Sequence, residues 1–136
     1  MFGSRRKVAS VVVYDPGQDG VVPVLRVPTG ETWTIEAAYA VADRTSAAST
    51  ADYWAVGLYN GGTAGTAVDA VSSANAGGTA GWVANTPKSI SITDGSGDLS
   101  AGQYLCVNYA ETGTAAPGVI SVFIEYVEGH GSTATA

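Results

Sequence analysis

This sequence has little of the chemistry on which enzymes and disulfide-rich proteins depend. Its 136 residues include one cysteine, Cys106, and one histidine, His130. A single cysteine excludes an intrachain disulfide, which small secreted domains often need. No apolar run approaches the roughly 20 residues of a membrane-spanning helix. We therefore expect a protein that is made in a cytoplasm and has no membrane partner.

Catalytic groups are scarce as well. Nucleophilic catalysis needs a nucleophile, a base and a group that orients the base. His130 lies between two glycines near the C-terminus, where no pattern holds it against a partner. The sequence contains no Gly-x-Ser-x-Gly elbow and no phosphate-binding loop. We predict that the protein is not an enzyme and carries no cofactor and no metal.

Two pairs of aspartates are candidates for a cation-binding site. Asp15 and Asp19 are four residues apart, as are Asp94 and Asp98, and both pairs lie among glycines. Such loops can bind calcium through carboxylate and carbonyl oxygens. Turns use the same residue types, so we interpret both segments as turns. A glycan hydrolase that uses two of the acids is the alternative from the enzyme class.

The few charges of this chain are unevenly distributed. Only 13% of the residues are charged, and the net charge is −6. Three of the six cations, Arg5, Arg6 and Lys7, form one run, whereas all twelve acids follow it. A nucleic-acid-binding protein would present a basic face, which this acidic body lacks. We expect residues 1–7 to form a mobile arm that binds an acidic protein surface, with Phe2 as an apolar anchor.

Two-residue alternation of apolar and polar side chains is the dominant pattern, and it is typical of β-strands. It predicts strands over residues 8–14, 21–27, 31–43, 52–60, 81–85, 88–93, 103–110 and 119–128, with Pro23 favouring an edge position for the second. Val68 and Val71 can add a brief strand within a long glycine-rich loop. We therefore predict an all-β fold, an antiparallel, jelly-roll-like β-sandwich of about eight strands. The domain spans residues 8–128, and residues 129–136 form a flexible tail.

The same alternation predicts which side chains face the core. Over residues 31–43 it places Ala37, Tyr39 and Val41 on the face of Trp33. The expected core comprises Trp33, Ile35, Trp54, Val56, Leu58, Leu105, Val107, Ile120, Val122 and Ile124. Cys106 lies mid-strand and is expected to be inert packing.

Three aromatic side chains on the opposite strand faces suggest self-association. Tyr53, Tyr59 and Phe123 would be exposed on a monomer, and soluble monomers rarely expose large apolar patches. We expect these residues in an oligomer interface, most simply that of a homotrimer.

Trp82 suggests an alternative function. It follows a glycine-rich loop, and its ring is a candidate platform for stacking on a sugar. The alternative from the binding class is therefore a glycan-binding adhesin or head-fibre module that mediates attachment to a host surface.

Two segments resemble jelly-roll domains of viral and tumour-necrosis-factor-like type. Residues 24–35 read VLRVPTGETWTI and resemble a strand, a Pro-x-Gly turn and the next strand; residues 99–107 read LSAGQYLCV and resemble the start of a late strand. With its low charge and Gly/Ala/Thr-rich loops, the chain resembles the capsid decoration, or cement, proteins of tailed phages. The resemblance implies a homotrimeric virion protein that binds the major capsid protein on the capsid exterior and stabilises the shell.

Overall fold

The computed structural model describes residues 6–14, 20–65, 69–72, 76–93, 97–114 and 118–128. Within these ranges the chain forms ten strands and one short 3-10 turn, η1 (Gly62–Ala64), and no α-helix. The described ranges contain no helix with the length and apolarity needed to cross a membrane. The strands are β1 (Arg6–Val13), β2 (Gly20–Arg26), β3 (Trp33–Ala42), β4 (Tyr53–Asn60), β5 (Asp69–Ala70), β6 (Ala76–Gly78), β7 (Lys88–Ile90), β8 (Asp98–Leu99), β9 (Tyr104–Thr112) and β10 (Ile120–Val127).

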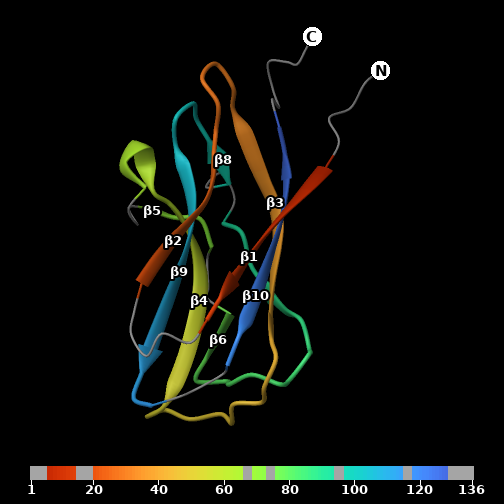
Figure 1. Ribbon diagram of the computed structural model, residues 1–136, viewed down its shortest axis with the longest axis vertical. Helices are drawn as coiled ribbons and strands as arrows, with labels where there is room; N and C mark the ends of the chain where they lie inside the picture. Colours follow the sequence, from red (N-terminus) through yellow and green to blue (C-terminus); the bar gives the residue numbers. More distant parts are fainter. Residues whose placement is uncertain are drawn as a thin grey trace.

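The strands form two antiparallel five-stranded sheets. In sheet A the order is β1-β10-β3-β7, with β8 also paired to β3; in sheet B it is β2-β9-β4-β5, with β6 also paired to β4. The first four strands alternate between the two sheets. The last two strands return to the first two, so that β10 pairs with β1 in sheet A and β9 pairs with β2 in sheet B. This nested order is a hairpin rolled into a sandwich, which is the jelly-roll arrangement. Figure 1 shows sheet A with β3 and β10 on the right and sheet B with β2 and β9 on the left. The predicted fold class is confirmed.

The core lies between the two sheets, and the ten side chains predicted to fill it are all buried. Trp54, Leu58 and Leu105 have no exposed surface. Burying a side chain the size of leucine contributes about 1.5–3 kcal/mol. Because each strand places every second residue inward, an unbroken alternation in the sequence identifies these ten core residues.

One prediction about strand faces is wrong, because β3 contains a bulge. In the pairing of β3 with β10, Glu125 lies opposite Ala37, while the next residue, Tyr126, lies opposite Ile35. Glu36 is therefore an extra residue on β3. An extra residue reverses the inward and outward sense of everything that follows it.

The bulge exchanges the two faces of the second half of β3. Three small side chains, Ala38, Ala40 and Ala42, are buried. Tyr39, which the simple alternation places in the core, is 36% exposed, and Val41 also points outward. The larger side chains of this segment therefore lie on the surface, and small ones fill the core.

The strands also differ from the prediction in where they begin and in which short strands are present. β1 begins at Arg6, so Arg6 and Lys7 belong to sheet A and not to a separate arm. Residues 81–85 form no strand, since Trp82 makes only an isolated bridge to Ser46. The brief strand expected in the glycine-rich loop corresponds to β5, whereas β6 and β8 were not predicted. Residues 1–5 and 129–136 lie outside the described ranges.

Candidate protein-binding surface

Apolar side chains gather on the outer face of sheet A. Phe123 of β10 lies directly opposite Tyr39 of β3 in the sheet register. Phe123 is 39% exposed and Tyr39 is 36% exposed. Together with Val41 and Pro87 they line an open groove of about 360 Å³. We call these four residues the apolar face.

A second hollow continues the apolar face along the sheet. Its volume is about 420 Å³, and it shares Val41 with the first groove. Val12 and Tyr14 on β1 and just after it form part of its lining, and they are 45% and 70% exposed. The outer surface of sheet A thus carries two adjoining hollows over three neighbouring strands. The first is apolar, whereas Asp43, Asn85 and Ser121 add polar groups to the lining of the second. Exposed apolar patches of the first kind mark interaction sites on soluble proteins.

The bulge at Glu36 creates the apolar face. Without the extra residue, β3 would present Ala38 and Ala40 beside Phe123 and would bury Tyr39. Sequence reasoning identified Phe123 but missed Tyr39 and Val41 for this reason. The available signal was the size of the residues, because alanines at three alternate positions leave the larger side chains on the other face.

The outer face of sheet B is covered around Cys106, in contrast. η1 contacts β9, and the residue after it, Gly65, lies above Cys106. The thiol of Cys106 donates a hydrogen bond to the Gly65 carbonyl oxygen at 3.5 Å. Cys106 is fully buried, although it points away from the core side chains Leu105 and Val107. Burial raises the pKa of the Cys106 thiol, as expected of packing rather than a reactive group.

The three aromatic residues predicted to share an oligomer interface do not lie together. Tyr53 and Tyr59 alternate with the buried Trp54, Val56 and Leu58, so they lie on the outer face of sheet B, where both are half-buried. Phe123 lies on the outer face of sheet A. The two faces are on opposite sides of the sandwich, so these side chains cannot form one continuous patch on one chain.

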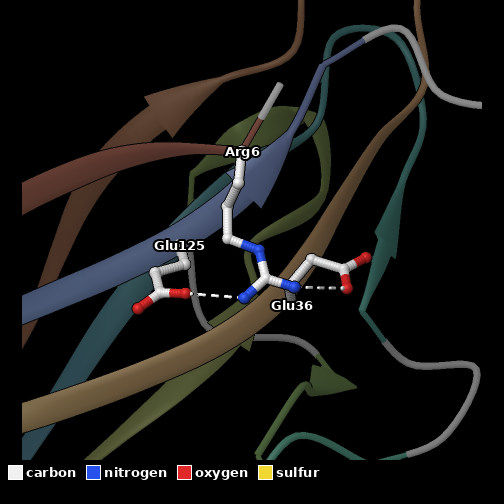
Figure 2. A network of polar contacts seen from close by, with 3 residues as sticks. All are labelled: Arg6, Glu36 and Glu125. Atoms are coloured by element: carbon white, nitrogen blue, oxygen red, sulfur yellow. Dashed lines mark hydrogen bonds and ion pairs between the residues drawn. The ribbon is translucent and has the colours of Figure 1, made fainter. Parts of the chain in front are cut away.

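The basic residues of β1 are paired with acids of the same chain. Figure 2 shows the Arg6 guanidinium between two carboxylates, with Nη1 2.9 Å from Glu125 Oε1 and Nη2 3.4 Å from Glu36 Oε1. These residues come from three adjacent strands, and the bulge residue Glu36 contributes one of the acids. Lys7 Nζ donates to Glu128 Oε1 at 2.7 Å, and this hydrogen bond raises the pKa of Lys7.

These pairs involve Arg6 and Lys7, two of the four residues that the sequence predicts to bind a capsid. The charges of Arg6 and Lys7 are balanced locally, which weakens their attraction to another acidic surface. Phe2 and Arg5, the other two members of that set, lie outside the described residues.

Trp82 does not present a sugar-binding ring. Its side chain is 1% exposed, and its indole N–H donates to the Trp54 carbonyl oxygen at 3.1 Å. Gly77 packs so closely on the indole that an added Cβ would lie 2.5 Å from the ring. Stacking on a sugar requires an exposed ring face, so the structure places Trp82 in the core and not in a glycan site.

The aspartate pairs can be followed only in part. Asp98 lies in β8, where it accepts a hydrogen bond from Thr34 Oγ1 at 2.8 Å. Asp15, Asp19 and Asp94 lie outside the described residues, as does His130. In the part of the chain that the structure describes, no group of three or more His, Cys, Asp or Glu side chains is arranged to hold a metal ion.

Comparison with known proteins identifies no similar protein. No protein-family model matches the chain, and no curated protein or solved structure matches it either. A jelly roll hosts many unrelated functions. Function is therefore inferred from the surfaces described above and from the resemblance in the sequence.

Proposed function

We propose that this chain is a structural protein of a virus particle that binds the outside of a phage capsid and stabilises the shell. The apolar face is the observation that carries the binding part of this proposal. Its aromatic side chains project from two paired strands of sheet A, so they are held in place before a partner arrives. The virion setting comes from the resemblance of the sequence to decoration proteins.

The form of the apolar face favours a protein partner over a small ligand. Small-molecule sites are enclosed and combine apolar walls with a few polar groups that orient the ligand. The groove of Tyr39, Val41, Pro87 and Phe123 is open and has no charged residue in its lining. Exposed aromatic residues at the centre of a patch are typical of energetically important positions in protein interfaces.

Stabilisation of a shell then follows from mass action. A protein that binds the assembled lattice and not the free subunits stabilises the lattice. At a free concentration of 100 times Kd this contributes about 2.7 kcal/mol per site. The partner under this proposal is the major capsid protein. Phe2, Arg5, Arg6 and Lys7 stay a predicted second contact with it.

The test uses phage heads assembled without this chain. Purified protein is added, and saturable cosedimentation and the temperature at which the heads open are measured. We expect saturable binding and a higher opening temperature. Phe123→Ser and Tyr39→Ser should each weaken binding by about tenfold or more, the usual effect of truncating an interface aromatic.

A matched control lies on the other sheet. Val21 of β2 is 37% exposed, which is close to the exposure of Tyr39 and Phe123, and Val21→Ser should bind like the unchanged protein. Equal binding by Phe123→Ser, Tyr39→Ser and Val21→Ser would reject the proposal that the apolar face binds the capsid. Failure of the unchanged protein to bind heads, with saturable binding to host-surface glycans, would support the adhesin alternative.

A further inference from the structure

The edge strands of the two sheets differ in length. β1 and β2 are edge strands of eight and seven residues, whereas the strands at the opposite edges, β5 to β8, have two or three residues each. Edge strands carry backbone N–H and C=O groups that can pair with another chain, and short edges limit this pairing. Within the described ranges, the edges with the length for a new strand pair are therefore β1 and β2.

Within the described residues, β2 carries features that protect an edge against pairing, and β1 carries none of them. Pro23 removes one N–H from β2, and the register with β9 shifts between Pro23 and Leu25. Proline and bulges are the devices that protect natural sheet edges. β1 pairs with β10 over eight residues without a shift. It has no proline, and from Val8 to Val13 it has no charged residue.

We infer that a second copy of this chain pairs with β1 across a two-fold axis, so that two sheets A join into one continuous sheet. This surface is the free edge of β1 and not the apolar face, so the inference goes beyond the proposed function and does not depend on it. Two-fold pairing of identical strands is necessarily antiparallel, and antiparallel pairing is the arrangement used throughout this sandwich.

The alternation of β1 restricts the register. Val11 and Val13 pack against the core, while Val8, Ser10 and Val12 face outward. Residues directly opposite in an antiparallel pair point to the same face. Only registers that match outward residues with outward residues therefore keep the buried side chains inside.

One such register suits the side chains of both copies. With the axis at Ser10, Val8 lies opposite the second copy's Val12, and Ser10 lies opposite itself. β-Branched residues are favourable cross-strand partners. Lys7 and Arg6 lie opposite the second copy's Val13 and Tyr14, so no two like charges meet. A register centred on Lys7 would oppose two lysines.

This pairing gives a closed assembly of two copies, to which no third copy can be added in the same way. Each copy has one unprotected long edge in its described part, and the dimer covers both of them. The inference therefore predicts a dimer, or an assembly built from dimers, in place of the homotrimer expected from the resemblance.

The experiment measures mass by light scattering over a range of protein concentrations. The unchanged protein should shift from one chain to two as concentration rises. Val8 and Val12 are 62% and 45% exposed, so both tolerate a polar replacement. The double variant V8K/V12K places lysine opposite lysine twice and should remain a single chain at every concentration.

A charge-reversed variant tests the register itself. In V8K/V12E each lysine lies opposite the second copy's glutamate, so this variant should form the dimer that V8K/V12K cannot form, and added salt should weaken it. Val21→Lys, on the protected edge β2, should behave like the unchanged protein. Near-ultraviolet circular dichroism verifies that each variant is folded.

Three results would overturn the inference. One is an unchanged protein that stays a single chain or forms three-chain species. Another is a V8K/V12K variant that still pairs. The third is equal loss of pairing in V8K/V12K and V8K/V12E, which would reject the register centred on Ser10.

Discussion

Sheets A and B are built from the same kind of strand, but they meet the solvent differently. Sheet A exposes Tyr39 and Phe123 on its outer face and ends in an unprotected strand, β1. Sheet B has its outer face covered beside Cys106 and ends in β2, which contains Pro23. Both proposals therefore concern sheet A. In this sandwich, the surfaces available for binding are decided by what covers the outer face of each sheet, since the inner faces of both sheets are buried in the core.

The largest expected effect tests the burial of Trp82 in the core between the two sheets. Trp82→Ala should lower the free energy of unfolding by about 3–5 kcal/mol, because it empties a large core volume. It also leaves the Trp54 carbonyl oxygen without the indole donor. Chemical denaturation measures the change. Val83, the next residue, is 57% exposed, and Val83→Ala should change stability by less than about 0.5 kcal/mol. A stable Trp82→Ala variant would contradict the burial of this ring.

A second prediction concerns the cover over sheet B. The Cys106 thiol should react with a thiol reagent only when the protein unfolds, because Gly65 and the sheet bury it. Its pKa in the folded protein is raised above the ordinary 9.0, so folding favours the protonated form. The free energy of unfolding should therefore fall as the pH rises from 9 upward, since the unfolded chain releases this proton first.

Cys106→Ala isolates that contribution. Its unfolding free energy should lose the part of the alkaline decline that the thiol causes, while the part due to Lys7 remains. Rapid labelling of Cys106 in the folded protein would show that the outer face of sheet B is open like that of sheet A.

A smaller effect is expected at the start of β1. Arg6→Met removes the ion pairs with Glu125 and Glu36, and exposed pairs contribute at most about 1 kcal/mol. The loss should shrink as salt is added. A double-mutant cycle with Glu125→Gln measures the coupling of the pair. A coupling of zero at low salt would show that the ion pair does not help to hold β1, which would then depend on its pairing with β10 and on the packing of Val11 and Val13.

The smallest expected effect on stability concerns Tyr39, on the exposed outer face of sheet A. Tyr39→Ser should change the free energy of unfolding by no more than about 0.5 kcal/mol while it weakens capsid binding. Thermal and chemical unfolding check the first part. A large loss of stability would mean that the apolar face belongs to the fold and that its exposure does not signal a partner.

Much of this molecule follows from its sequence alone. Alternation identified the long strands and all ten predicted core residues, because side chains along an unbroken strand alternate with a period of two. Pro23 marked β2 as an edge, since a proline cannot donate a hydrogen bond to a second neighbour. These are local rules, and they need no knowledge of which strands pair.

Other features were decided only by the tertiary structure. The bulge at Glu36 arises where β3 pairs with β10, and it places Tyr39 on the outer face of sheet A, although alternation predicts it on the face of Trp33. The burial of Trp82 and Cys106 depends on segments distant in sequence that pack over them. The charge of Arg6 is paired with that of Glu125, a residue 119 positions later in the sequence. In each case the deciding neighbour comes from another strand or loop, so a periodicity that relates a residue only to its own segment could not reveal it.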